Sequence, residues 1–176
     1  MMSTDDVLSI LELLQAGGVD VWLGGGWGID ALLGEQTRLH SDLDIAISHV
    51  AETSIRSVLQ PVGFRQLPAD NAFNFVLADA AGREVDIHLV DFESTRLDER
   101  GTEVYGPRGL AYELGSLEGH GVIAGRVVAC ETPEFQMKGH TRYVPAEKDV
   151  RDVMALHHAF GLPLPPPYDE LRSEPL

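Results

Sequence analysis

The chain has 176 residues, enough to bury a full core as one domain, or as one domain with a helical appendage. Thirteen basic against twenty-eight acidic residues give a formal net charge of −15 at pH 7, which argues against affinity for the phosphate backbone of DNA or RNA. No apolar run is long enough to cross a bilayer, the acidic start lacks the basic region of a signal peptide, and one cysteine allows no internal disulfide. We therefore expect a cytoplasmic protein whose field attracts metal ions and cationic small molecules.

The first part of the chain leads into a glycine turn. An amphipathic helix is predicted over 4–16, a short strand over 20–23 and a short helix over 27–33. Three glycines at 24–26 join that strand to that helix. Glycine lets a backbone approach a ligand closely, and a helix N-terminus offers free N–H groups, so the turn is a candidate phosphate site. A tight turn alone is the commoner reason for three glycines, and the spacing is that of neither a P-loop nor a dinucleotide fingerprint.

Two later runs place carboxylates on one face of a strand. Residues 40–47 and 84–90 alternate polar and apolar residues with the period of two that is typical of a half-buried strand. The polar positions are Asp42 and Asp44 in the first run and Glu84, Asp86 and His88 in the second. Residues two apart on a strand stand about 6.6 Å from each other, and carboxylates at such spacing repel unless a cation or a proton neutralises them. Asp42, Asp44 and Asp86 are therefore predicted to hold divalent metal ions.

The remaining patterns complete an α+β fold. They predict a helix near 51–60, strands around 64–67 and at 71–77, a hairpin turn at 79–82, a loop-rich stretch over 91–121, a strand within 121–130, helices near 133–140 and 146–160, and a proline-rich tail over 162–167. Together they give a mixed sheet flanked by helices over 1–132. A small C-terminal helical segment with its tail, over 133–176, is expected to pack on it.

Seven short runs form a set that points to one family. They are Gly-Gly-Trp-Gly-Ile-Asp at 25–30, Thr-Arg-Leu-His-Ser-Asp-Leu-Asp at 37–44, and the runs at 85–88, 121–126, 133–136, 140–143 and 148–152. The set resembles the small antibiotic nucleotidyltransferases, namely the lincosamide nucleotidyltransferases and aminoglycoside 2''-adenylyltransferases of the DNA polymerase β-like superfamily. The resemblance extends to about residue 161. One departure is Arg142, where that family usually has glycine, so the substrate contacts expected there are in question.

The resemblance implies the nucleotidyltransferase fold and a metal-dependent transfer. An NMP, AMP from ATP or the equivalent from another NTP, would pass to a hydroxyl of a small cationic compound such as a lincosamide or an aminoglycoside. Two Mg²⁺ ions would be held by Asp42, Asp44 and Asp86. Asp86 would stand nearest the acceptor hydroxyl and act as the base, unless Glu84 takes that role.

The nucleotide would be held by groups outside the acidic set. By resemblance, the backbone of Gly25 and Gly26 would bind the β- and γ-phosphates. Arg38 is a candidate for neutralising the leaving pyrophosphate, unless it pairs with a nearby carboxylate instead. Lys138 or Lys148 is a candidate for a further contact with a nucleotide phosphate.

Two alternatives keep the fold and change the function. The acceptor could be a protein, as in toxin–antitoxin modules, but the helical extension after Pro133 argues against this because the minimal proteins of that type lack it. The chain could instead be a non-catalytic nucleotide-binding module. A degenerate site need not keep three mutually repelling carboxylates, however, so an enzyme is the favoured interpretation. The acceptor's identity, the preferred nucleotide and the oligomeric state stay open.

Overall fold

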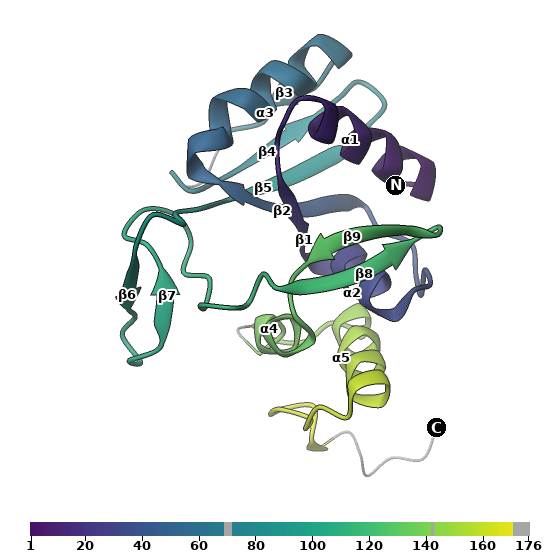
Figure 1. Cartoon of the computed structure of the whole chain (residues 1–176). Coiled ribbons are helices and arrows are strands. Elements are labelled where there is room, and N and C mark those ends of the chain that lie inside the picture. The colour runs from purple at the N-terminus through teal and green to yellow at the C-terminus, as the bar shows by residue number, and fades with distance from the viewer. Residues whose placement is uncertain (69–71, 142, 171–176) are drawn as a thin grey trace.

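The computed structural model describes residues 1–68, 72–141 and 143–170 (Figure 1). Its helices and strands are α1 (Thr4–Ala16), β1 (Val21–Leu23), α2 (Gly25–Leu33), β2 (Asp42–Ser48), α3 (Glu52–Leu59), β3 (Arg65–Gln66), β4 (Asn74–Ala78), β5 (Glu84–Val90), β6 (Thr95–Leu97), β7 (Glu103–Tyr105), β8 (Gly119–Ile123), β9 (Arg126–Cys130), α4 (Pro133–Gly139) and α5 (Glu147–Phe160). Short 3₁₀ turns at His49–Ala51 and Gln60–Val62 flank α3.

Seven of the strands form one mixed sheet in the order β3-β4-β5-β2-β1-β9-β8. The pairs β2–β5 and β1–β9 are parallel, and the other pairs are antiparallel. Strands β6 and β7 form a separate hairpin beside the sheet (Figure 1). The predicted α+β architecture with a mixed sheet and flanking helices is confirmed.

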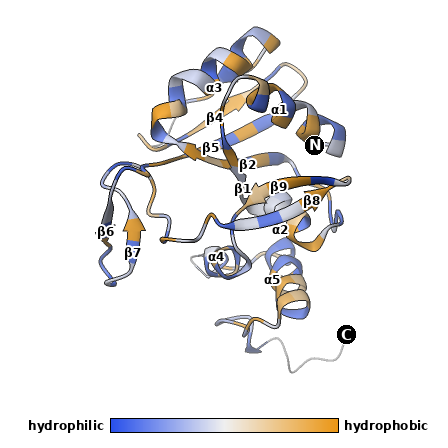
Figure 2. Ribbon diagram, viewed as in Figure 1, coloured by the Kyte–Doolittle hydropathy of each residue, from blue (hydrophilic) through white to orange (hydrophobic). Residues whose placement is uncertain are grey.

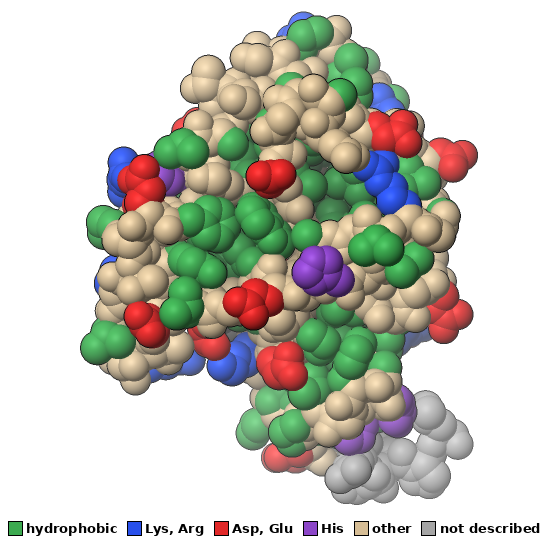
Figure 3. Space-filling view, viewed as in Figure 1, with side chains coloured by type: hydrophobic (Ala, Val, Ile, Leu, Met, Phe, Trp, Pro, Cys, Tyr) green, Lys and Arg blue, Asp and Glu red, His purple; other side chains and the backbone are tan. Residues whose placement is uncertain are grey.

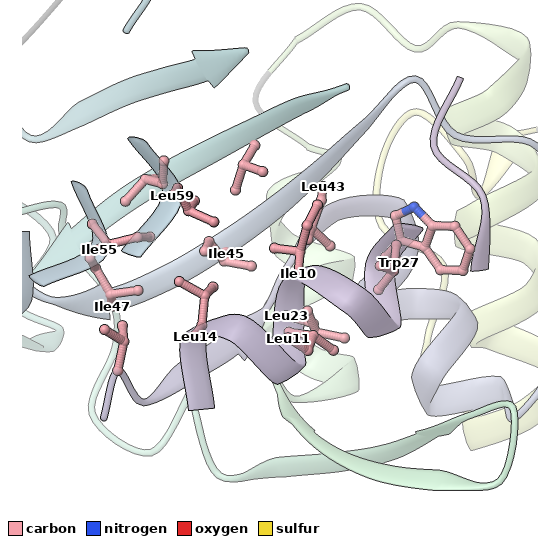
Figure 4. Packing of buried hydrophobic residues seen from close by; sticks show 14 of the residues in the cluster. Ile10, Leu11, Leu14, Leu23, Trp27, Leu43, Ile45, Ile47, Ile55 and Leu59 are labelled. Carbon is pink, nitrogen blue, oxygen red and sulfur yellow. The ribbon is translucent and has the colours of Figure 1, made fainter. Parts of the chain in front are cut away.

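One face of the sheet carries the main hydrophobic core. Leu43, Ile45 and Ile47 of β2 are buried on this face, against side chains of α1 and α3 such as Leu14 and Ile55 (Figure 4). The matching alternation along β2 and β5 is visible in Figure 2. Because the apolar residues of β2 face this core, Asp42 and Asp44 face the opposite side of the sheet.

Helix α2 lies on that opposite side, between the sheet and the C-terminal helices (Figure 1). It contacts β8 so closely that a side chain at Gly121 would overlap the backbone of Ala31. A second apolar cluster joins α2 to the C-terminal part of the chain: Ile29, Met137, Val153, Leu156 and Tyr168. The Tyr168 hydroxyl donates to the carbonyl of His140 at 3.0 Å, which fastens the tail to the end of α4. Helix α2 is thus held from two sides.

Four local predictions differ from the structure. The stretch 91–121 contains the β6–β7 hairpin and the start of β8, and the single strand expected within 121–130 is a hairpin that turns at Ala124-Gly125. Strands β6 and β7 have three residues each, so they show no alternation that a sequence pattern could reveal. Helix α2 begins at Gly25 instead of Trp27. The strand predicted at 71–77 runs over Asn74–Ala78, and its predicted first residue, Asn71, lies outside the described residues.

On one face of the molecule the acidic side chains stand apart from one another (Figure 3). On the face seen in Figure 3, acidic side chains are spread among apolar and polar ones. Among the described residues, none of the helices combines the length and the apolar composition that crossing a membrane requires.

The close contact between α2 and β8 gives a stability prediction. Replacing Gly121 by alanine puts a methyl group into the backbone of Ala31 and Leu32, which cannot move aside as a side chain could. We expect the free energy of unfolding, measured by urea denaturation, to fall by about 1–3 kcal/mol. The matched control is Gly139→Ala, where no atom lies within 4 Å of the added carbon. Equal stabilities of the two variants would contradict the described packing.

Candidate active site

The acidic residues of β2 and β5 meet across the parallel strand pair. In the register of the two strands Asp44 lies beside Asp86 and Asp42 beside Glu84. Adjacent strands lie about 4.8 Å apart, so neighbouring side chains on one face are close enough to share a ligand. Potential ligand atoms of Asp44, Asp86 and His88 all lie within 4.8 Å of one another. The predicted convergence of Asp44 and Asp86 is therefore present in the structure.

Asp44 is the most perturbed carboxyl of this group. Burial and the charges of Asp42 and Asp86 raise its pKa from 3.8 to about 6, against the opposing effects of His88 and Lys148. A raised pKa means that the ionised form is destabilised where it stands. A cation at this position would remove that penalty.

A chain of polar side chains leads away from Asp86. His88 Nε2 lies 3.6 Å from Asp86 Oδ1, and His88 Nδ1 lies 2.8 Å from the hydroxyl of Tyr112. That hydroxyl donates to Glu131 Oε1 at 3.1 Å, so Nδ1 is the donor to Tyr112. Burial acts to lower the pKa of His88, but the hydrogen bond and the charge of Asp86 outweigh it, and the net pKa is raised. Asn74 Nδ2 donates to the same oxygen, Asp86 Oδ1, at 2.7 Å.

The glycine turn lies directly against the acidic strands. Gly25 has φ +51° and packs on Asp44 so tightly that an added Cβ would overlap the carboxylate. At Gly26 an added Cβ would overlap the ring of His40 and the guanidinium of Arg38. Both positions therefore require glycine. The first turn of α2 has N–H groups without partners in the helix itself, and it faces the same space as Asp44.

Two cavities meet at Gly25 and Asp44. The larger, a cleft of about 780 Å³, extends from the glycine turn to α5, and its charged wall includes Arg38, Asp42 and Lys148. The smaller, of about 360 Å³, is lined by His88, the rings of Tyr112 and Phe135, and the carboxylate of Glu131, among others. His140 and Tyr143 line both cavities. The site is therefore a junction with a partly cationic side and an aromatic, acidic side.

The other predicted site residues take different places. Arg38 lines the larger cleft, and its guanidinium is paired with Asp152, a partner that the sequence did not suggest. The structure does not bring Lys138 to this cleft, because its ammonium lies 2.7 Å from Glu113 in a separate pocket, whereas Lys148 does line the cleft. Glu84 is exposed at the start of β5, and neither Glu84 nor the predicted ligand Asp42 belongs to the cluster of Asp44, Asp86 and His88. Arg142 lies outside the described residues.

Three residues of the site were missed by the sequence analysis. Tyr112 belongs to the stretch predicted as loop, so nothing marked it. Glu131 follows β9 directly, and the pattern Arg-Val-Val-Ala-Cys gives no sign that the next side chain turns into a cavity. Asp152 belongs to the run at 148–152, but no role was predicted for it, and its side chain is only 2% exposed. An acidic residue on the same face as Val153 and Leu156 of α5 is the only signal that could have found it.

The acidic cluster fits a divalent cation. Its donors are hard carboxylate oxygens, which Mg²⁺ prefers, with one imidazole at the edge. Asp44 carries an ionisation penalty caused by burial and by its acidic neighbours. Donor type and electrostatics agree, so the residues present suit a metal ion beside the glycine turn.

Comparison with known proteins assigns the chain to a class and then to a family. A model of the aminoglycoside-2''-adenylyltransferase family matches residues 6–156. A 2''-aminoglycoside nucleotidyltransferase of Escherichia coli is 30% identical over 137 residues, which is 76% of this chain and 71% of the relative. A lincosamide resistance protein of Staphylococcus haemolyticus is 35% identical over 60 residues, 34% of this chain and 37% of the relative. The chain is thus an enzyme of the nucleotidyltransferase class, and it belongs to the aminoglycoside-2''-adenylyltransferase family.

Solved structures support the fold independently. The lincomycin-bound lincosamide adenylyltransferase LnuA superposes with a TM-score of 0.72 at 23% identity, covering 88% of this chain and 96% of that one. ANT(2'')-Ia in complex with adenylyl-2''-tobramycin gives 0.73 at 23% identity, covering 90% of this chain and 89% of that one. The predicted nucleotidyltransferase fold and family resemblance are confirmed.

The raised pKa of Asp44 predicts an unusual pH dependence for the metal-free protein. Since the folded-state pKa is about 6 against 3.8, protonated Asp44 stabilises the fold at low pH, and this contribution is lost as pH rises from about 4 through about 6. In chelator at pH 7.5, Asp44→Asn should therefore increase the free energy of unfolding by about 1–3 kcal/mol. Mg²⁺ should raise the melting temperature of the wild type but not of this variant.

A control with the opposite expectation is Asp79→Asn. Although burial opposes it, the hydrogen bonds from Arg83 lower the pKa of Asp79, so its ionised form is stabilised in the fold. This variant should be less stable than the wild type at pH 7.5. If Asp44→Asn were also less stable than the wild type in chelator, the electrostatic interpretation of the acidic strands would be wrong.

Proposed function

We propose that the enzyme transfers a nucleoside monophosphate, AMP from ATP, to a hydroxyl of a small amine-bearing acceptor of the lincosamide or aminoglycoside type. The observation that carries the proposal is the pairing of Asp44 with Asp86 beside Gly25, where two cavities meet. A cytoplasmic location and a pair of Mg²⁺ ions are parts of the same proposal. So is packing of the C-terminal segment 133–176, of which 142 and 171–176 lie outside the described residues, on a catalytic unit of residues 1–132.

The larger cleft suits the triphosphate of the donor. It offers the N-terminal turn of α2, the guanidinium of Arg38 and the ammonium of Lys148 on one side of the acidic strands. Helix N-termini and cationic side chains are the groups that bind phosphates in proteins. Of the two lysines that are candidates for a phosphate contact, Lys148 lines this cleft and Lys138 does not, so the role is assigned to Lys148.

The smaller cavity suits a cationic acceptor. The rings of Tyr112 and Phe135 lie 5.1 Å apart, centroid to centroid, and Glu131 is buried beside them. Aromatic faces attract ammonium groups, and a buried carboxylate favours a positive partner. An amine would bind well here, whereas a second phosphate would be repelled.

The chemistry would be an in-line displacement at the α-phosphorus. When bound, divalent ions held by Asp42, Asp44 and Asp86 would neutralise charge on the phosphates. The acceptor oxygen would form a bond to phosphorus, the bond from phosphorus to the β-phosphate oxygen would break, and pyrophosphate would leave. Asp86 would accept the proton of the acceptor hydroxyl. Asn74 donates to Oδ1 of Asp86, and His88 Nε2 lies 3.6 Å from the same oxygen, so the carboxylate is oriented before the acceptor arrives.

The test of the acceptor is a mass-spectrometric screen. The protein is incubated with Mg²⁺ and each NTP together with a panel of lincosamides and aminoglycosides, and products are searched for the mass of an added nucleotide. The proposal expects an adduct with at least one amine-bearing antibiotic. No adduct with any antibiotic, together with labelling of a co-purified protein, would favour a protein acceptor instead.

The role of Asp86 gives a sharper prediction. Asp86→Asn should lower turnover by at least about 100-fold, because a general base contributes about 10²–10⁴ in rate. Circular dichroism should show an unchanged fold. Glu84→Gln, on the same strand and face, is the matched variant and should keep most of the activity because Glu84 lies outside the acidic cluster. The reverse pattern, with Glu84→Gln inactive and Asp86→Asn active, would transfer the role of base to Glu84.

A further inference from the structure

Helix α5 reaches the donor cleft through one buried ion pair. Arg38 Nε lies 2.9 and 3.2 Å from the two carboxylate oxygens of Asp152, and Nη2 lies 2.7 Å from Oδ2. The side chain of Asp152 is 2% exposed and that of Arg38 18% exposed. A guanidinium that donates from both Nε and Nη2 to one carboxylate has lost most of its rotational freedom.

The segment that carries Arg38 is anchored on the other side by α2. Asp30 Oδ1 accepts from the backbone N–H of Thr37 at 3.0 Å and from its hydroxyl at 2.6 Å. The other oxygen of Asp30 bonds to the buried ring of His40. Residues 37–40 are thus bound to α2 through Asp30 and to α5 through Asp152. The contacts of Asp30 fix the backbone that carries Arg38, and Asp152 fixes the direction of its guanidinium.

The guanidinium has capacity left for a ligand. Asp152 engages Nε and Nη2, and one N–H of Nη1 donates to the carbonyl of Leu39 at 3.3 Å. These bonds use three of the five N–H groups of the guanidinium. The other two N–H groups have no hydrogen-bond partner within the described part of the chain. Nη2 also lies close enough to Gly26 that a Cβ there would touch it. The open side of Arg38 therefore lies next to the glycine turn, in the larger cleft.

We propose that Asp152 is a positioning residue for the nucleotidyl transfer: it holds the Arg38 guanidinium against the glycine turn so that its open edge binds the donor's phosphates. The inference rests on the proposed function, since it takes the larger cleft as the donor site. It assigns to the C-terminal helix a part in nucleotide binding that Asp152, whose side chain is 2% exposed at the wall of the cleft, performs by orienting Arg38.

The proposal can be separated from a simple effect of charge. Asp152 adds a negative charge near the phosphate position, and Asp30 and Asp149 also act on Arg38. If charge alone decided nucleotide affinity, removing the Asp152 carboxylate would strengthen binding. If orientation of Arg38 decides, the same change weakens binding. The two explanations therefore predict changes of opposite sign in the affinity for the nucleotide.

The experiment measures the dissociation constant of a non-hydrolysable ATP analogue with Mg²⁺ by titration calorimetry, using the whole chain. Asp152→Asn should weaken binding about tenfold, the loss expected for one charge-assisted hydrogen bond. Asp79→Asn is the matched control, because it also removes a buried carboxylate paired with an arginine, Arg83, and neither residue lines the cleft. It should lose thermal stability and keep the wild-type affinity.

A double-mutant cycle tests whether Asp152 acts through Arg38. Arg38→Gln should weaken binding at least as much as Asp152→Asn, and adding Asp152→Asn to it should change the affinity less than about twofold. Equal losses in both backgrounds would show that Asp152 acts independently of Arg38 and would overturn the proposal. Unchanged or tighter binding by Asp152→Asn in the otherwise wild-type chain would overturn it as well.

A second variant covers the case in which Asp152→Asn does not fold. Arg38→Lys keeps the charge and Asp152 but loses the two-point contact, so its affinity should fall toward that of Arg38→Gln. Wild-type affinity in Arg38→Lys would contradict the importance of orientation. If the wild type itself binds no nucleotide, the proposed function fails together with this inference, whereas normal wild-type binding with no effect of Asp152→Asn defeats this inference alone.

Discussion

Two carboxylates that lie side by side on parallel strands determine how the rest of this site must be built. The register of β2 and β5 sets Asp44 beside Asp86, and burial together with neighbouring acids raises the pKa of Asp44 to about 6. Because the pKa is raised, the ionised carboxylate lowers the stability of the metal-free fold at neutral pH. Such an arrangement is expected of a site that binds a cation. The hydrophobic core on the other face of the sheet supplies the stability of the fold.

The surroundings of the acidic pair serve to bring an anion close to it. Gly25 and Gly26 have no room for side chains, so the first turn of α2 can lie directly on Asp44 and Arg38. Helix α2 is itself fixed between β8 and the cluster that contains Met137 and Leu156. The C-terminal helices therefore do more than cover the sheet, since they hold the glycine turn in place and contribute walls to both cavities.

The parts predicted from the sequence are those governed by local periodicity or by a motif. The bounds of α1 and β5, the shared face of Asp42 and Asp44, and the class of enzyme follow from alternation, spacing and resemblance. The parts of the site that were not predicted from the sequence depend on contacts between distant segments. Arg38 and Asp152 are 114 residues apart, and Tyr112 meets Glu131 and His88 only because a loop without periodicity folds over the sheet. No local pattern contains that information, and the same is true of Lys138, whose side chain turns away from the cleft toward Glu113.

The most direct test of the central claim is a crystal structure of the chain soaked with Mn²⁺ and a non-hydrolysable ATP analogue, with anomalous scattering used to locate the metal. Density for Mn²⁺ bound by Asp44 and Asp86, next to phosphates on the turn at Gly25 and Gly26, is the predicted result. Nucleotide bound in the cleft with no metal at these carboxylates, or metal and nucleotide bound elsewhere on the molecule, would contradict the account.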